Sequence, residues 1–155
     1  MVLVPFLALF FAIFDFSMSM FLKNTMQFAV RQGVRYAVTS RVVLNATNTS
    51  IGHDASIRQI VRTNSMGFLD YLAPSGFGRP CSGDACITIR YYDPSTLLEV
   101  TSPTANTGGN IVKVSAENLS WAWMVPLLRS ASPLNFSVSS ADMMEASPNG
   151  IPPAR

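Results

Sequence analysis

The feature that most constrains this chain is an apolar run at its N-terminus. Between Met1 and Leu22, 18 of 22 residues are hydrophobic, and the run holds six of the ten Phe of the sequence. A helix of this length is about 33 Å long, which matches the roughly 30 Å hydrocarbon core of a bilayer. We therefore predict a transmembrane helix over residues 1–22. A cleaved signal peptide is a weaker alternative, because no basic residue precedes the run and no small-residue cleavage site ends it. A buried core helix would rarely carry Phe all round its circumference.

Asp15 is the only charged residue in this run. A carboxylate in the hydrocarbon region costs about 2.5 to 3.5 kcal/mol on insertion scales unless it is paired or protonated. Two interpretations stay open. Asp15 either faces a partner helix or neighbouring subunit that supplies a donor, or it is protonated or close enough to an interface to reach water.

The helical pattern continues beyond Leu22 but becomes amphipathic, which predicts that the same helix extends over residues 23–44. One side carries Leu22, Met26, Ala29, Gly33, Tyr36 or Ala37, and Ser40, and the other side carries Lys23, Gln27, Arg31, Arg35 and Thr39. The small residues Ala29, Gly33 and Ala37 lie four apart and allow another backbone to approach closely. That backbone belongs either to another chain or to the protein's own head domain.

The rest of the chain, about 133 residues, is enough for one small domain, which we place at 45–146. An Asn- and Ser-rich connection precedes a short helix expected from Asp54 to Asn64, with Asp54 as its N-cap. Alternation of apolar and polar residues then predicts three strands, at 87–92, 111–115 and 134–139, joined as an antiparallel meander. The expected fold class is therefore α+β, a long N-terminal helix on a small sheet. We expect Trp121 and Trp123 in the core and a disordered tail over 147–155.

Cys81 and Cys86 are the only cysteines, and four residues separate them. Two cysteines with no nearby histidine cannot form a four-ligand zinc site, and the spacing is not that of a C-x-x-C redox motif. A structural disulfide is the favoured interpretation, and it implies an oxidising compartment for the head. Two unpaired thiols are the alternative.

The distribution of basic residues favours the opposite location for the head. Lys23, Arg31, Arg35 and Arg41 follow the apolar run and nothing basic precedes it, so the positive-inside rule places the head in the cytoplasm. A basic leader upstream of Met1 would remove this conflict, because it would hold the N-terminus inside.

The sequence contains no catalytic constellation. His53 is the only histidine and is expected at the surface, so a Ser-His-Asp or Cys-His arrangement has no clear partner. No phosphate-binding loop or zinc-protease motif is present. The net charge of +2 identifies no charged partner. The arginines adjoin an apolar span, which suits lipid headgroups or charge pairing in an assembly better than nucleic acid. We expect no enzyme activity, no cofactor, no metal and no small-molecule substrate.

Residues 2–40 carry a family pattern. An apolar run is opened by a proline and followed by an acidic residue and Phe, and then by an A-x-R-x-G-x-R-Y-A segment. In this chain these positions are Pro5, Asp15, Phe16, Ala29, Arg31, Gly33, Arg35, Tyr36 and Ala37. The segment resembles the N-terminal domain of TadE-like proteins, which are minor pilins or pseudopilins of the tight-adherence (Flp) pilus system. Members of that family usually have a basic leader and a glutamate a few residues before the proline. We expect that either a misplaced start codon or trimming of the sequence accounts for their absence here.

The resemblance implies a pilin-like fold in the bacterial inner membrane, with a single span and an extracytoplasmic head that can enter a pilus. Its implied partners are membrane lipid and other pilin-type subunits, without nucleic acid. The alternative is a single-span anchored periplasmic binding domain that joins no filament and holds a partner through Trp121, Trp123 or its loops.

Overall fold

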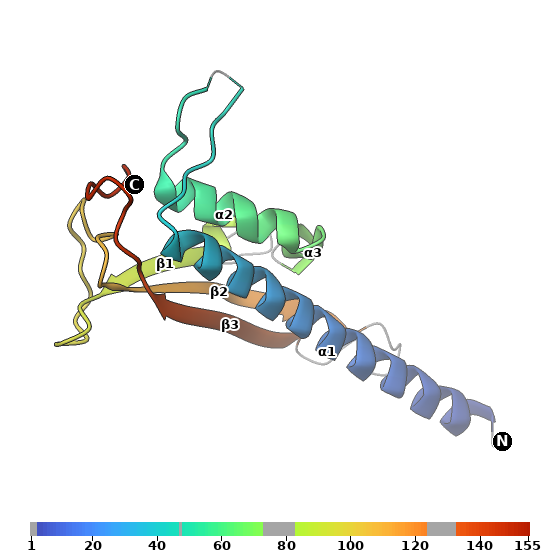
Figure 1. The fold of residues 1–155 in the computed structure, drawn as a ribbon. Coiled ribbons are helices and arrows are strands. Elements are labelled where there is room, and N and C mark those ends of the chain that lie inside the picture. Colours follow the sequence, from blue (N-terminus) through green and yellow to red (C-terminus); the bar gives the residue numbers. More distant parts are fainter. Residues whose placement is uncertain (1–2, 47, 73–82, 124–132) are drawn as a thin grey trace.

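One uninterrupted helix, α1 (Leu3–Val38), forms the spine of the molecule in the computed structural model (Figure 1). The structure describes residues 3–46, 48–72, 83–123 and 133–155. The remaining elements are α2 (His53–Asn64), α3 (Phe68–Leu72), a short 3-10 helix η1 (Gly83–Cys86), β1 (Ile87–Tyr92), β2 (Ile111–Trp121) and β3 (Leu134–Met143). The predicted long N-terminal helix is confirmed as a single element, but it ends at Val38 and not at residue 44 as predicted.

The three strands form one antiparallel sheet in the order β1-β2-β3. This confirms the predicted meander and the α+β class. The second strand is longer than the predicted 111–115, because its pairing with β3 continues to Trp121 beyond a register shift between Ala116 and Leu119. Asn118 has a φ of 58° at this irregularity. A bulge of this kind interrupts the alternation of buried and exposed residues, which is the signal that a sequence pattern follows.

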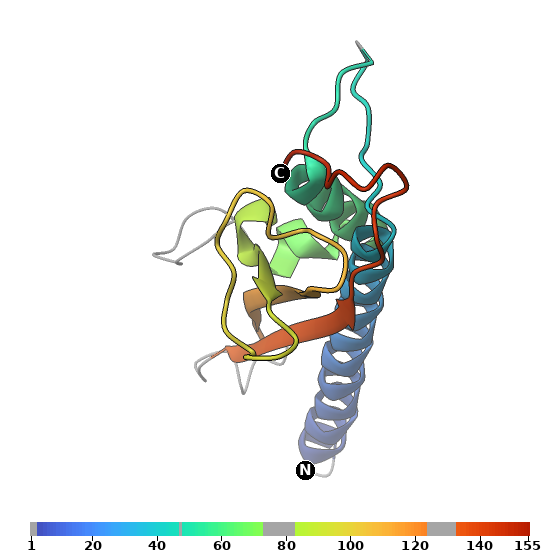
Figure 2. The ribbon, with the colours of Figure 1, turned by 60° about the vertical axis from the view of Figure 1, so that its left-hand side comes forward.

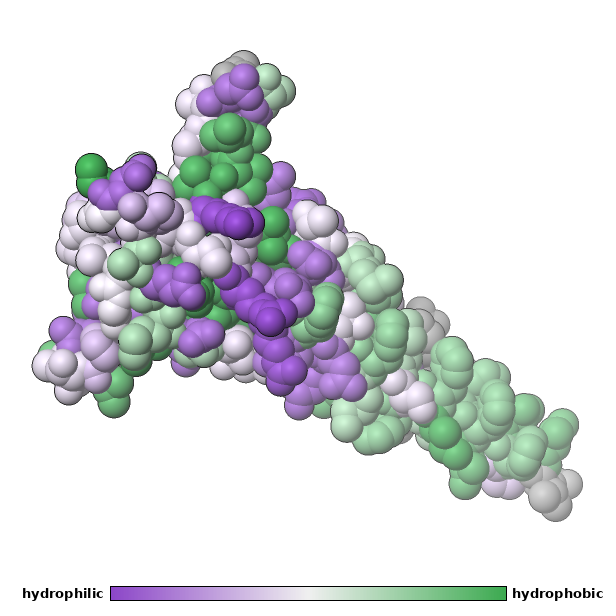
Figure 3. All heavy atoms as spheres, viewed as in Figure 1, coloured by the Kyte–Doolittle hydropathy of each residue, from purple (hydrophilic) through white to green (hydrophobic). Residues whose placement is uncertain are grey.

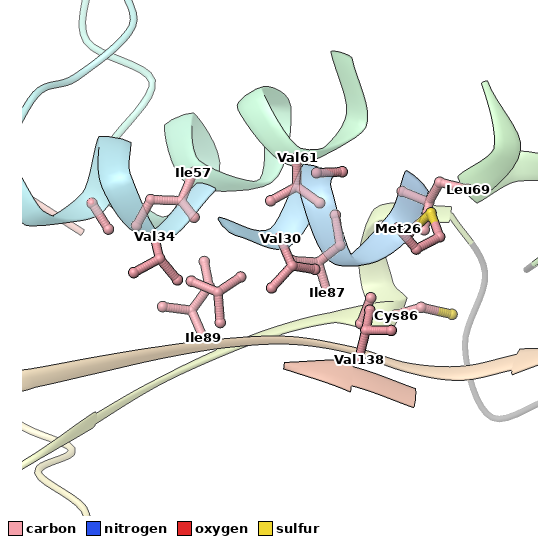
Figure 4. Packing of buried hydrophobic residues seen from close by; sticks show 14 of the residues in the cluster. Met26, Val30, Val34, Ile57, Val61, Leu69, Cys86, Ile87, Ile89 and Val138 are labelled. Atoms are coloured by element: carbon pink, nitrogen blue, oxygen red, sulfur yellow. The ribbon is translucent and has the colours of Figure 1, made fainter. Parts of the chain in front are cut away.

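The core lies between the sheet and the two longer helices. Figure 4 shows Val30 and Val34 of α1 pointing toward the strands, which contribute Ile87, Ile89 and Val138, and it shows Met26 beside Leu69 of α3. Helix α2 closes the side of this layer with Ile57 and Val61, and both are fully buried. In Figure 2 the sheet and α2 both lie along the upper part of α1, and its N-terminal part projects alone.

The N-terminus of α2 differs from the prediction in two respects. The helix begins at His53 after an N-cap Gly52 with a φ of 91°, and Asp54 does not cap it. His53 is fully buried, so the prediction of a surface histidine is wrong. The physical reason lies in distant residues: Nδ1 of His53 is 3.2 Å from the hydroxyl of Tyr91 in β1, and that hydroxyl donates to Asp54 Oδ1 at 2.8 Å.

The C-terminal segment completes this polar cluster. Arg155 forms an ion pair with Asp54 Oδ2 at 3.0 Å, and its guanidinium lies 4.7 Å from the centre of the Tyr91 ring. The amide of His53 donates to the carbonyl of Ala154 at 2.7 Å. The segment 147–155, for which the sequence predicts disorder, therefore has defined contacts over the start of α2 in the structure.

Candidate assembly surface

The N-terminal part of α1 presents an apolar surface that the described part of the protein leaves uncovered. None of the residues from Leu3 to Phe14 is buried. Twelve large apolar side chains between Leu3 and Phe21 are exposed by 41% or more, namely Leu3, Val4, Phe6, Leu7, Leu9, Phe10, Phe11, Ile13, Phe14, Phe16, Met20 and Phe21. Figure 3 shows this hydrophobic surface along the projecting helix, in contrast to the polar head. The helix is long and apolar enough to cross a membrane.

A second, buried stripe begins at Asp15 and follows α1 toward the head. It consists of Asp15, Ser19, Leu22, Met26, Ala29, Val30, Gly33, Val34 and Ala37. Asp15 is only 1% exposed, whereas its neighbour Phe16 is 59% exposed. The two adjacent residues of the family pattern thus lie on opposite sides of the helix. Asp15 faces the side that this chain itself covers, so its burial needs no second subunit.

The small-residue face lies on the protein's own head. Ala29 and Ala37 are fully buried, and a Cβ added at Gly33 would overlap the Cγ2 methyl of Val61 in α2 and meet that of Ile57 at 3.6 Å. Of the two alternatives that the sequence leaves open, the structure shows the second. Gly33 is needed because α1 and α2 approach closely at this point.

The arginines of the pattern lie on the outer side of α1, where Arg31 and Arg35 are exposed. Arg35 and Tyr36 line an open hollow of about 340 Å³ between α1 and α2, together with Gln32, Thr39, Arg41, Ile60 and Asn64. No acidic side chain is among these lining residues. Burial raises the pKa of Tyr36, and the nearby charge of Arg41 acts in the opposite direction. The donors around this hollow suit an oxyanion such as a carboxylate, which a guanidinium can bind through two hydrogen bonds.

The structure describes only one of the two cysteines for which a disulfide is predicted. Cys86 is buried at the end of η1, but Cys81 lies outside the described residues, so the disulfide stays a prediction. Within the described ranges, no group of three or more His, Cys, Asp or Glu residues is arranged to hold a metal ion. The cluster of His53, Tyr91, Asp54 and Arg155 was not predicted, since its members are far apart in the sequence. The one sequence signal for this cluster is the alternation in β1, which predicts that Tyr91 lies on the buried side of the strand.

Comparison with known proteins adds one finding. Residues 1–35 match the family model described as TadE-like protein. The N-terminal segment is TadE-like. This confirms the suspected resemblance, and the TadE-like segment contains Pro5, Asp15, Phe16 and the motif as far as Arg35, with Tyr36 and Ala37 directly after it. No curated protein and no solved structure matches the chain. The TadE-like match and the apolar helix together fit a membrane-anchored, pilus-related protein.

Proposed function

We propose that this protein is a minor pilin or pseudopilin that takes part in assembly of a tight-adherence, Flp-type, pilus. The observation that carries the proposal is the uncovered apolar half of α1 within the TadE-like segment. Fully burying one large apolar side chain contributes about 1.5 to 3 kcal/mol, so covering twelve partly exposed ones contributes on the order of 10 to 20 kcal/mol. Such a surface is stable in a bilayer or against other apolar helices, and a pilin-type subunit meets both.

The head supports this role by holding the helix in a fixed position. The packed half of α1 contributes Met26, Val30 and Val34 to the head core, so the head and the apolar helix form one rigid unit. The proposed action is binding rather than catalysis, without cofactor or small-molecule substrate. The hollow at Arg35 and Arg41 offers a polar contact for a carboxylate of a neighbouring subunit.

Crosslinking in intact cells tests this function. A photoreactive phenylalanine analogue replaces Phe10 or Phe16, which are 57% and 59% exposed, in cells that express the other pilus components. Adducts with pilin-type subunits are expected from both positions. The same analogue at Leu98, which is 68% exposed on the loop after β1, serves as the matched control and gives no such adducts. Adducts with lipid alone at both positions contradict incorporation among pilin helices.

The alternative of an anchored periplasmic binding domain needs a different surface. It predicts that the head loops, rather than α1, crosslink to a partner. Trp121, which that alternative uses as a binding residue, is 1% exposed and is not available for a partner in this conformation.

We also propose that the head is extracytoplasmic, on the strength of the family resemblance and the two cysteines. A reporter that is active only in the periplasm, joined after Arg155 by a flexible linker, is expected to be active. Activity of a cytoplasmic reporter at the same position contradicts this orientation.

A further inference from the structure

The end of the head nearest the N-terminal half of α1 carries a connected set of aromatic and apolar side chains. We call it the head base and define it as Phe68, Tyr71, Trp121 and Leu134. The ring of Phe68 in α3 lies 5.9 Å from that of Phe21 in α1, and the ring of Tyr71 lies 5.9 Å from that of Trp121 at the end of β2. Trp121 is the strand partner of Leu134, the first residue of β3. Figure 1 shows α3 and this end of the sheet on the side from which α1 projects.

The contacts of β3 fix the height of the head base along α1. The side-chain amide of Gln27 donates to the carbonyl of Ser139 at 3.0 Å, and the amide of Glu145 donates to the carbonyl of Val38 at 3.1 Å. The strand therefore runs in the same direction as α1. Leu134 begins five residues before Ser139, about 16 Å further toward the N-terminal end of α1.

This height lies within the apolar part of the helix. Phe21, the last exposed apolar residue before Lys23, is six residues before Gln27, a distance of about 9 Å along α1. Even if β3 crosses α1 at about 45°, Leu134 lies roughly 11 Å from the level of Ser139. Leu134 is thus at or beyond the level of Phe21.

Burial on α1 supports the same level independently. Ser19 is 4% exposed and Asp15 is 1% exposed, so this chain covers the helix down to residue 15. Asp15 is a further six residues, about 9 Å, beyond Phe21. This chain therefore covers one side of α1 within the apolar segment.

The side chains of the head base suit a lipid–water boundary. Tyr71 is 56% exposed and Leu134 is 39% exposed. Tyrosine concentrates at membrane interfaces, because its apolar ring and its hydroxyl are satisfied together there. Trp121 is 1% exposed, so it lies behind the ring of Tyr71 rather than at the surface. The apolar surface of the head base also continues that of α1 through the Phe21–Phe68 contact.

From this continuity we infer that the head base rests in the interfacial layer of the bilayer, so that lipid contacts the head as well as the helix. This inference rests on the proposed membrane anchoring but not on entry into a pilus. The bilayer is the partner of this surface, because lipid that surrounds the apolar part of α1 also reaches the level of Leu134.

The two tryptophans of the chain test the inference directly, since Trp121 belongs to the head base and Trp123 follows it by two residues. The full chain is reconstituted into phosphatidylethanolamine and phosphatidylglycerol vesicles in which part of the lipid carries bromine near the headgroup, at mid-chain or at the acyl end. We expect tryptophan emission to be quenched most by the bromine nearest the headgroup. Absence of quenching by all three lipids overturns the inference, and so does strongest quenching by the acyl-end label.

A matched pair of variants separates lipid contact from chance proximity. Tyr71→Glu places a charge in the head base and is expected to reduce the headgroup-level quenching by about twofold or more, because a carboxylate disfavours the interface. Leu98→Glu has the same kind of change on the loop at the other end of the sheet and is expected to leave quenching unchanged. Equal loss in both variants, with equal protein retained in the vesicles, contradicts a specific role of the head base. Quenching without adducts to pilin-type subunits would refute the proposed function alone.

Discussion

Replacement of Gly33 is the sharpest test of the packing between α1 and α2. A Cβ at this position overlaps the Cγ2 methyl of Val61, which is fully buried. Valine in a helix has one strongly preferred side-chain rotamer, so the methyl cannot turn away and α2 has to shift. Overpacking of this kind costs about 1 to 3 kcal/mol.

The size of the substituent decides the net effect. Gly33→Ala gains about 1 kcal/mol from helix propensity, which leaves a net loss of about 0 to 2 kcal/mol in the free energy of unfolding. Gly33→Leu adds three further carbons toward Ile57 and is expected to lose about 3 kcal/mol. For a chain of this size, 1 kcal/mol corresponds to about 2 to 4 °C, so the Leu variant should melt roughly 6 to 12 °C lower.

The assay is thermal unfolding of the full chain in detergent, with crosslinking through Phe10 measured in parallel in membranes. Arg31→Leu is the matched control, because Arg31 is exposed two residues away on the same helix. It should change stability by less than about 0.5 kcal/mol. An unchanged melting temperature in Gly33→Leu, together with lost crosslinks, would show that this face contacts another chain and would refute the packing argument.

Three further predictions concern the head. Burial lowers the pKa of His53 below its ordinary 6.5, so as the pH falls from about 7 the unfolded state binds a proton more readily than the folded state. The melting temperature should therefore fall between pH 7.5 and pH 5, and His53→Gln should reduce this dependence of the melting temperature on pH. Arg155→Ala removes a partly exposed ion pair with Asp54 and the contact with the Tyr91 ring, and it should lower the free energy of unfolding by about 1 kcal/mol in denaturant titration. An unchanged denaturation midpoint would show that these contacts of the C-terminal segment do not stabilise the head. Mass analysis of unreduced protein should find the Cys81 and Cys86 peptides joined and two protons lighter than the dithiol, and free thiols in exported protein would contradict the disulfide.

Elements with a strong local pattern could be predicted from the sequence. The length of α1 follows from continuous apolar and then amphipathic periodicity, and β1 follows from strict alternation between Ile87 and Tyr92. The extension of β2 could not be predicted, because the irregularity at Asn118 destroys the alternation while the strand still pairs with β3.

Which part of the protein covers each face of a helix could not be predicted without the tertiary structure. Ala29, Gly33 and Ala37 permit close approach by any backbone, so only the positions of Val61 and Ile57 show that α2 is the neighbour. Likewise, the sequence leaves two interpretations of Asp15 open, a donor from a partner or protonation near an interface, and it does not show that this chain itself buries the residue. The burial of His53 depends on Tyr91, which is 38 residues away, and a local pattern carries no information about such a contact.

The continuity of α1 has a mechanical consequence. Because one helix without interruption from Leu3 to Val38 is both membrane anchor and core element, the protein has no hinge between them. Val38 lies 17 residues, about 25 Å, beyond Phe21, so a 10° tilt of the apolar part displaces the top of the helix by about 4 Å. Any neighbour that reorients the apolar segment thereby moves the whole head by a fixed amount, and the orientation of the helix among its neighbours sets where the distal loops point.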